Sequence, residues 1–369
     1  MSIRVLIADH SAAFGRVIKE VLEAIADVEV CGLCRNSQAA NQRILVESPD
    51  LVVLDVELPP SDCLEVLQAM RQGKMRATAI LIGDANGRSR DLTAKALELG
   101  ALDFVERTDG GDEQESLRAL RERLVPLVAA AVRRKEVQTI LRGSSSAKPA
   151  AAMISAAPAR TAVRERAAGE CPAETRCRVK PAMVLIGVST GGPEALARVI
   201  PALPANFRVP ILIVQHMPPH FTQNLAEKLN ESSALQVKEA EAGETARQGC
   251  VYIAPGGKHL KVIAGAQNQI VLRTSNDPPQ NNCRPAVDVL FRSAAEAFPG
   301  SAVAVILTGM GRDGTGGLRD LRAGGVVSIA QDEASCTIFG MPKEAIQAGL
   351  VDIVAPLNSI ASEIVKAVC

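Results

Sequence analysis

The stretch MVLIGVSTGGP, residues 183–193, runs from an apolar segment through a glycine-rich turn to a proline. Its first six residues are apolar or glycine, which is typical of a strand buried on both faces of a sheet. Proline is favoured in the first turn of a helix, so Pro193 indicates that a helix begins there. A buried strand followed at once by a helix is the repeating unit of parallel sheets, and the stretch therefore predicts an α/β fold.

The same alternation extends over residues 180–369. Apolar runs predict further strands at residues 209–214, 302–307 and 326–329, and helical patterns lie at residues 193–200, 219–230, 286–298, 314–323 and 342–348. Residues 236–273 instead carry short strand patterns separated by glycine turns, which predict β-hairpins at a sheet edge. We expect a Rossmann-like α/β domain with a β-hairpin edge.

Residues 1–122 repeat the alternation in five β-then-α units, with strand patterns at residues 5–8, 28–33, 51–54, 79–82 and 102–105. Five such units predict a (βα)5 domain built on a doubly wound parallel sheet. Residues 123–179 hold the end of a helix and then a tether rich in Ala, Ser and Pro. Because residues 121–180 contain 13 Lys or Arg and 5 Asp or Glu, the tether is basic. A solvated linker is favoured over a segment that contacts an acidic partner or a membrane.

The composition excludes several classes of protein. The 369 residues carry 41 basic and 41 acidic side chains, and only 2% are aromatic, which argues against a nucleic-acid-binding protein. No apolar run is long enough to cross a membrane, and Asp9 interrupts the N-terminus too early for a signal peptide. We therefore expect a cytoplasmic protein without membrane insertion. The pair Cys31 and Cys34 is predicted to be buried rather than a redox or metal site.

Ser189 lies at the centre of a G-x-S-x-G pattern, residues 187–191, between a predicted strand and a predicted helix. Small flanking residues permit a sharp turn that exposes a serine hydroxyl. Turns of this kind more often bind phosphate or only redirect the chain, although this one matches neither the G-x-G-x-x-G pattern nor the Walker lysine loop. A phosphate-binding turn therefore stays an alternative.

His216 ends the next predicted strand, and Asp313 follows another strand in a second glycine-rich turn. The carboxyl ends of neighbouring parallel strands meet at one edge, so we expect both side chains to lie near Ser189. A serine nucleophile needs a base, and the base needs an orienting carboxylate. Alone, Asp313 would be interpreted as the N-cap of the following helix. Together the three residues predict a Ser-His-Asp triad.

Five sequence blocks resemble the chemotaxis receptor methylesterase family, the CheB-type protein-glutamate methylesterases. In chain order they are IGVSTGG (186–192), QHMP (215–218), RPAVDVLF (284–291), LTGMGRDG (307–314) and FGMPKEA (339–345). The resemblance spans nearly the whole chain. It implies that Ser189 is the nucleophile, His216 the general base and Asp313 the orienting carboxylate. It also makes the backbone N–H of Met310 a candidate oxyanion donor.

The resemblance further implies a substrate and partners. The substrate is a glutamyl γ-methyl ester on the cytoplasmic helices of a chemoreceptor, and the products are methanol and glutamate. Receptor glutamines can be deamidated by the same chemistry. Such a triad needs no metal or other cofactor. A chemotaxis histidine kinase is a further candidate partner.

Residues 1–122 resemble the receiver domain of a two-component response regulator. The resemblance implies that Asp55 is the phosphorylation site and that Asp9 is the first of two acidic residues that hold Mg²⁺ with it. In this chain the second acidic position is His10, the Ser/Thr position is Gly83, and the lysine position is Arg107.

These replacements alter the expected regulation. His10 removes a hard oxygen ligand, so Mg²⁺ is expected to bind weakly, if at all, at Asp9 and Asp55. Gly83 has no hydroxyl for a phosphoryl oxygen, and Arg107 keeps the charge of lysine without its compact shape. We therefore favour a degenerate receiver over one that is activated by phosphorylation. A degenerate receiver would dock a partner or cover the active site without a phosphate switch. In both cases domain packing is expected to restrict access to the nucleophile.

Three functions remain in consideration. The preferred one is a methylesterase regulated by its receiver-like domain. The second is a docking module of a chemosensory pathway with weak catalysis. The third is a nucleotide-binding α/β protein that uses the turn at residues 187–192.

Overall fold

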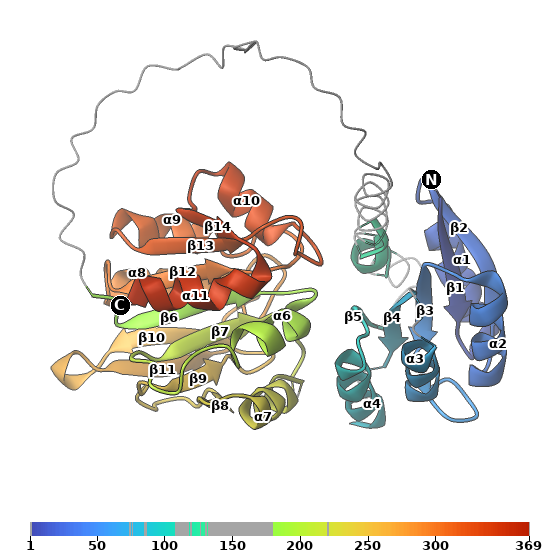
Figure 1. Cartoon of the computed structure of the whole chain (residues 1–369), viewed down its shortest axis with the longest axis horizontal. Helices are drawn as coiled ribbons and strands as arrows, with labels where there is room; N and C mark the ends of the chain where they lie inside the picture. Colours follow the sequence, from blue (N-terminus) through green and yellow to red (C-terminus); the bar gives the residue numbers. More distant parts are fainter. Residues whose placement is uncertain are drawn as a thin grey trace, which may run out of the picture.

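The computed structural model describes residues 2–73, 75, 77–84, 87–107, 118, 120–125, 127–129, 131, 180–219 and 221–368. They form two α/β units, one in each half of the chain (Figure 1). The linker at residues 123–179 lies almost wholly outside the described residues, so the domain boundaries 1–122, 123–179 and 180–369 stay predictions. Among the residues described, no helix has both the length and the apolarity needed to cross a membrane.

The N-terminal domain is built on a five-stranded parallel sheet with the strand order β2-β1-β3-β4-β5. β1 pairs with both β2 and β3, so the strand order reverses there, and the C-terminal ends of β1 and β3 border the crevice where such sheets bind ligands. This confirms the predicted doubly wound arrangement. In chain order the elements are β1 (Ile3–Ala8), α1 (Ala12–Glu23), β2 (Val28–Cys34), α2 (Ser37–Glu47), β3 (Leu51–Asp55), α3 (Cys63–Gln72), β4 (Thr78–Gly83), α4 (Gly87–Glu98) and β5 (Asp103–Glu106).

The C-terminal domain is built on a seven-stranded parallel sheet with the strand order β14-β13-β12-β6-β7-β9-β8. The order reverses at β6, whose neighbours β12 and β7 come from distant parts of the chain. The ligand crevice of this sheet is therefore expected at the C-terminal ends of β6, β7 and β12. Its elements are β6 (Met183–Val188), α6 (Gly192–Val199), β7 (Ile211–Gln215), α7 (Phe221–Ser232), β8 (Gln236–Glu239), β9 (Cys250–Ile253), β10 (His259–Ala264), β11 (Ile270–Ser275), α8 (Val287–Ala297), β12 (Ala302–Ile306), α9 (Thr315–Ala323), β13 (Val327–Gln331), α10 (Met341–Gln347), β14 (Ile353–Ala355) and α11 (Leu357–Val368).

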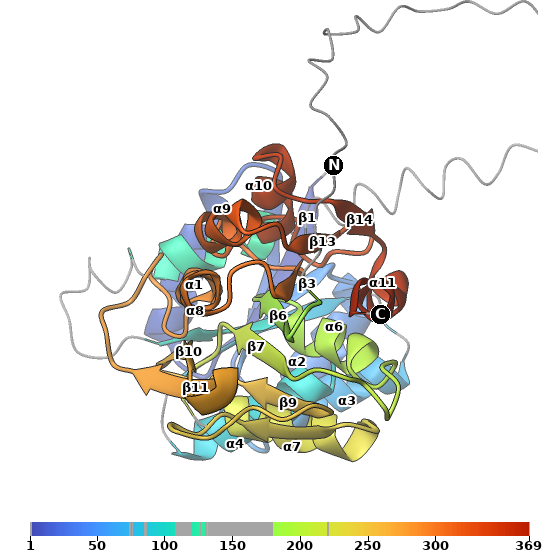
Figure 2. The same cartoon turned by 90° about the vertical axis from the view of Figure 1, so that its left-hand side faces the viewer.

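The prediction of hairpins at the sheet edge is correct for one pair of strands and wrong for the other. β10 and β11 form an antiparallel hairpin, but it is a separate two-stranded sheet that packs on α8 (Figure 2). β8 and β9 are parallel strands of the main sheet. The segment between them runs along β11, where Gly243 N donates to Leu272 O and Leu272 N donates to Glu244 O, each over 2.8 Å. This detour returns the chain to the end of the sheet at which β8 began, so β9 can run parallel to it.

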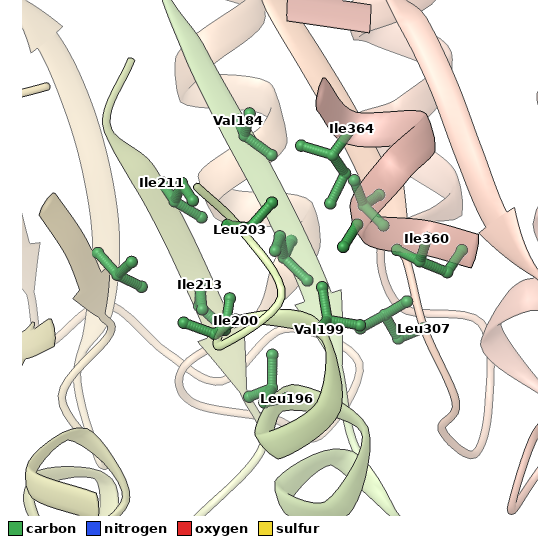
Figure 3. Packing of buried hydrophobic residues seen from close by; sticks show 14 of the residues in the cluster. Val184, Leu196, Val199, Ile200, Leu203, Ile211, Ile213, Leu307, Ile360 and Ile364 are labelled. Carbon is green, nitrogen blue, oxygen red and sulfur yellow. The ribbon is translucent and has the colours of Figure 1, made fainter. Parts of the chain in front are cut away.

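Apolar side chains cover both faces of the main sheet. On one face α6 and α11 pack on the strands, with Leu196, Ile213 and Ile360 fully buried (Figure 3). The other face packs against α8, α9 and the hairpin. Burial of one such side chain contributes about 1.5–3 kcal/mol, so the strand ends that carry the predicted site are held firmly.

The two domains contact each other through β5 and α4 on one side and α6 and α7 on the other (Figure 1). The ring centroids of Phe104 and Phe221 are 6.1 Å apart. Ile338, from the loop before α10, is buried in a hydrophobic cluster whose other buried members belong to the N-terminal half of the chain. The N-terminal domain therefore lies close to the strand edge that carries the predicted triad.

Candidate active site

Ser189 follows β6 at the point where the strand order reverses. Its backbone N–H donates to Thr308 O over 3.0 Å, which ties the turn to the loop after β12. Gly191 has a φ of 77°, which glycine adopts at little cost, and α6 begins at Gly192 with Pro193 in its first turn. This confirms the predicted strand-to-helix turn around Ser189.

The glycines of this turn make room for protein side chains. A Cβ atom at Gly192 would collide with Gln215 Oε1, and one at Gly191 would collide with Thr337. Gln215 also donates from Nε2 to Ser189 O over 2.9 Å. Because this space is filled from within the domain, the packing argues against a phosphate bound at residues 187–192.

His216 and Asp313 form a buried hydrogen-bonded pair beyond the ends of β7 and β12. His216 Nε2 donates to Asp313 Oδ2 over 2.7 Å, and the two side chains are 12% and 3% exposed. The same oxygen accepts from Val287 N at 2.6 Å, while Oδ1 accepts from Asn281 Nδ2 at 2.9 Å and from Asp288 N at 3.1 Å. Asp313 therefore accepts the first N–H groups of α8, and the N-cap of α9 is Gly314 without a side-chain cap.

The environment of the pair favours its charged form. Burial by itself would lower the pKa of His216, but the hydrogen bonds to Asp313 and Cys283 raise it to about 10. Burial would raise the pKa of Asp313, and the hydrogen bond from His216 together with the N–H donors holds it below its usual value. Both shifts favour an imidazolium beside a carboxylate. To act as a general base, His216 must first lose this proton.

Ser189 and His216 line one cavity, but their side chains are not hydrogen-bonded to each other. The second ring nitrogen of His216, Nδ1, lies 3.6 Å from Cys283 Sγ. Thus, among the described residues, two of the three predicted triad members are in direct contact and the third lies alongside. Proton transfer from Ser189 requires Nδ1 to exchange its thiol neighbour for the serine hydroxyl.

Met310, the candidate oxyanion donor, lies in the loop after β12, where it packs against the core of the N-terminal domain. Within the part of the chain that the structure describes, its backbone N–H donates to no protein acceptor. The preceding residue, Gly309, packs directly on Ser189, since a Cβ there would lie 2.8 Å from Ser189 Cβ. Met310 thus follows a residue that packs on Ser189, and its role as oxyanion donor stays a prediction.

Residues of both domains enclose the cavity beside Ser189. Its volume is about 40 Å³, and Phe104 lines it together with His216. Thr190 Oγ1 donates to Asp103 Oδ2 across the domain boundary, one residue from Ser189. A space of this size accommodates water but not a methylated glutamyl side chain on a helix.

The predicted metal ligands Asp9 and Asp55 lie together at the ends of β1 and β3, each in contact with side chains of the chain itself. Arg107 Nη2 is 2.9 Å from Asp9 Oδ2 and 3.6 Å from Asp55 Oδ2. His10 Nδ1 is hydrogen-bonded to Asp55 Oδ2. The guanidinium carbon of Arg107 lies 4.3 Å from the ring centroid of Phe14, which holds it in place. The guanidinium of Arg107 therefore lies within 4 Å of both buried carboxylates and offsets part of their charge.

Gly83 lies at the end of β4, where the packing leaves little room for a side chain. A Cβ atom there would lie 2.9 Å from Ser89 Oγ and 3.1 Å from Val56 Cβ. Its carbonyl accepts from Arg107 N over 2.7 Å. The hydroxyl nearest this position therefore comes from α4 and not from the strand end.

The sequence argument missed Asn281, Cys283 and Asp288, all of which contact the pair or its partners. Asp288 belongs to the block RPAVDVLF, but nothing in its spacing assigned it a role. The Asn-Asn dipeptide at residues 281–282 is a turn signal that could have drawn attention to the loop. Cys31 and Cys34 are free thiols; Cys34 is buried, as predicted, but the prediction is wrong for Cys31, which is only half-buried.

Two family models match the chain. The model described as CheB methylesterase matches residues 184–364. The model described as Response regulator receiver domain matches residues 5–115. The matches coincide with the two sheets described above.

Full-length relatives and a solved structure agree with these matches. A protein of Desulfotalea psychrophila (strain LSv54 / DSM 12343), named protein-glutamate methylesterase/protein-glutamine glutaminase, is 40% identical over 100% of this chain and 99% of its own length. A protein of the same name from Bacillus subtilis (strain 168) is 38% identical over 99% and 98%. The crystal structure of the Thermotoga maritima CheB methylesterase catalytic domain is 46% identical, with a TM-score of 0.50, over 51% of this chain and 99% of that one.

Proposed function

The chain belongs to the CheB methylesterase family, and on that premise we propose that it hydrolyses glutamyl γ-methyl esters on chemoreceptor helices. The products are a glutamate side chain and methanol. The names of the relatives also support hydrolysis of glutamine side chains, in which ammonia leaves instead of methanol. Both reactions are acyl transfers to water through a serine ester.

The first half of the reaction forms an acyl-enzyme. Ser189 Oγ attacks the ester carbonyl carbon while His216 Nδ1 takes its proton, because Nε2 is engaged by Asp313. The carbonyl oxygen becomes an oxyanion, and the Met310 N–H is the proposed donor to it. When the tetrahedral intermediate collapses, the methoxy group takes the proton from His216 and leaves as methanol.

The second half restores the enzyme. Water attacks the acyl carbon while His216 takes one of its protons, and that proton returns to Ser189 Oγ as the ester bond breaks. The glutamate carboxylate is released. Every bond made and broken involves only the ester, water and these side chains, so the cycle needs no cofactor.

The observation that carries the proposal is the 2.7 Å contact between His216 and Asp313 beside Ser189, at the crevice of the sheet that matches the family model. The test is methanol release from methylated receptor by the full chain and by Ser189→Ala. We expect release that Ser189→Ala abolishes. Equal release by both proteins would reject the proposal.

We further propose that the receiver-like domain restricts access to Ser189. The small cavity, the Phe104–Phe221 contact and the Thr190–Asp103 hydrogen bond support this role. An aromatic pair contributes about 0.5–1.5 kcal/mol beyond its buried area, so Phe104→Ala should raise methanol release up to about tenfold. Leu45→Ala, at a 67% exposed residue on α2, is the control that should leave the rate unchanged. A Phe104→Ala rate at or below that of the control would contradict the restriction.

We propose that this domain works without a conventional phosphate switch. Asp9 and Asp55 offer oxygen ligands, but the neighbouring imidazole of His10 and guanidinium of Arg107 do not suit Mg²⁺, which requires an octahedral shell of oxygen atoms. Arg107 supplies positive charge where the metal would lie. The residues therefore favour a degenerate receiver over one that is phosphorylated at Asp55.

A second candidate function is a docking module of a chemosensory pathway with weak catalysis. It is favoured by the absence of a hydrogen bond between Ser189 and His216 in the described structure. The expected location is the cytoplasm, with chemoreceptors and a chemotaxis histidine kinase as partners. A Ser189→Ala strain that keeps its full chemotactic response would support this alternative, and a strain that loses it would support the esterase.

A further inference from the structure

A tight turn at residues 280–283 passes beside the His216–Asp313 pair. Gln280 N donates to Cys283 O over 3.1 Å, and Cys283 N donates to Gln280 O over 2.9 Å. The two central residues, Asn281 and Asn282, have φ values of 53° and 60°. Asn is one of the few side-chain-bearing residues that adopt this left-handed conformation readily, so both positions suit the turn.

The Asn281 carboxamide bridges two carboxylates. Its Nδ2 lies 2.9 Å from Asp313 Oδ1 and 2.9 Å from Asp288 Oδ2. An amide nitrogen carries two hydrogens, so each carboxylate receives one. An aspartate here would have no hydrogen to donate at neutral pH, and a smaller side chain would not reach both oxygens.

The second carboxylate is itself anchored. Asp288 is 6% exposed, and its Oδ1 accepts from Gly317 N over 2.7 Å in the first turn of α9. Asn281 is therefore held at one side by a residue that is fixed between α8 and α9. At the other side it holds Asp313 Oδ1, while Oδ2 faces His216.

We propose that Asn281 is a positioning residue for the catalytic pair, an inference that rests on the proposed function. It touches neither Ser189 nor the reacting atoms and acts through Asp313. Without its amide, Asp313 Oδ1 keeps only the N–H of Asp288, and the Asp288 carboxylate faces Asp313 without a shared donor. The repulsion between the two carboxylates then acts on Oδ1, while Oδ2 keeps its bonds to Val287 N and His216, so the carboxylate fixes the direction of the imidazole less firmly.

The test compares two glycine variants of one turn in the full chain. Asn281→Gly removes the amide and keeps the left-handed backbone that glycine adopts freely. Asn282→Gly is the matched control, because the Asn282 side chain makes no hydrogen bond with the described residues. Asn281→Asp is a second variant, which keeps the size of the side chain and replaces its donor by an acceptor.

Two measurements decide the proposal. Displacement of a catalytic group by about 1 Å costs on the order of 10²-fold, so kcat for methanol release should fall by about that factor in Asn281→Gly and at least as far in Asn281→Asp, with KM unchanged. The Asn282→Gly variant should remain within twofold of the parent chain. Nuclear magnetic resonance should show the His216 Nε2 proton sharp in the parent chain and in Asn282→Gly, but broadened by exchange in Asn281→Gly.

The resonance separates this inference from the proposed function. If no protein releases methanol but the broadening is confined to the Asn281 variants, the esterase proposal fails and the positioning role stands. If Asn281→Gly keeps a sharp resonance and a kcat within twofold of its control, the positioning role is overturned. Equal broadening in both glycine variants would also overturn it, because the turn and not the amide would then hold the pair.

Discussion

Two buried carboxylate clusters lie at equivalent edges of the two sheets, and they differ in what compensates their charge. In the receiver-like domain, Asp9 and Asp55 face the guanidinium of Arg107 and a partly exposed His10. In the C-terminal domain, Asp313 faces His216 and neutral N–H donors. On the proposed functions, the guanidinium of Arg107 occupies the first cluster in place of a metal ion, whereas the imidazole of His216 lets the second cluster move a proton. In both domains the fold places acidic side chains at the ends of parallel strands. The basic residue that faces them then determines what each cluster can do.

The largest effect is expected when the charge of Asp313 is removed. Asp313→Asn keeps the shape of the side chain but no longer stabilises the imidazolium, and such a change typically lowers the rate by about 10⁴-fold. Methanol release at saturating receptor measures it, with Asp320→Asn, an exposed partner of Arg292, as the control. A loss of less than tenfold would show that Asp313 serves only to cap α8.

A second experiment converts the cluster of Asp9 and Asp55 into a metal site. His10→Asp with Arg107→Lys restores an oxygen ligand and replaces the guanidinium by a compact ammonium, so Mg²⁺-dependent labelling by a small phosphodonor should appear at Asp55. The parent chain should stay at background, and adding Asp55→Asn to the double variant should remove the label. Mass spectrometry of intact protein measures it. Equal labelling of the parent chain would break the contrast between the two clusters.

The pH profile tests whether His216 titrates as its surroundings require. The pKa of His216 is raised to about 10, so the neutral imidazole that accepts the serine proton is scarce at neutral pH and increases as pH rises toward that value. Well below this pKa, kcat/KM should rise about tenfold per pH unit. Release by Ser189→Ala is subtracted at each pH to remove spontaneous ester hydrolysis. A plateau from pH 7 upward would show that the free enzyme holds a neutral imidazole.

The smallest effect is expected at Cys283. Its thiol is a weak partner of His216 Nδ1, so Cys283→Ala should change methanol release by less than about fivefold. Alkylation of the parent chain with iodoacetamide should inhibit more strongly, because the added group fills the space beside the imidazole. If Cys283→Ala were as inactive as Ser189→Ala, the thiol would be needed for the reaction and not only a weak partner of the imidazole.

Much of the fold could be predicted because the buried strands of a parallel sheet are continuous apolar runs in the sequence. β6 begins and ends at the residues that the pattern of MVLIGVSTGGP indicates. The placement of β8 and β9 could not be predicted, since four short strands with glycine turns look alike whether they pair as hairpins or join a parallel sheet. β14 and α11 carry no strong start signal and were not predicted.

Ser189, His216 and Asp313 could be placed at one crevice from the sequence, because the carboxyl ends of parallel strands meet at one edge of the sheet. The hydrogen-bond partners of their atoms could not be placed in this way. The loop that follows the hairpin brings Cys283 to His216 Nδ1 and places the Asn281 amide between two carboxylates. The path of such a loop leaves no periodic pattern in the sequence. The pairing of Arg107 with both receiver carboxylates likewise depends on side-chain reach, which the substitution pattern alone did not specify.

β5 connects the carboxylate cluster of the receiver-like domain with the boundary between the two domains. It is four residues long, with Asp103 and Phe104 at the domain boundary and Arg107 directly after its other end. At about 3.3 Å per residue, some 13 Å separates Arg107 from Asp103. A ligand that pulled the guanidinium away from its carboxylates would therefore act through this one short strand on Asp103 and Phe104, which line the cavity beside Ser189.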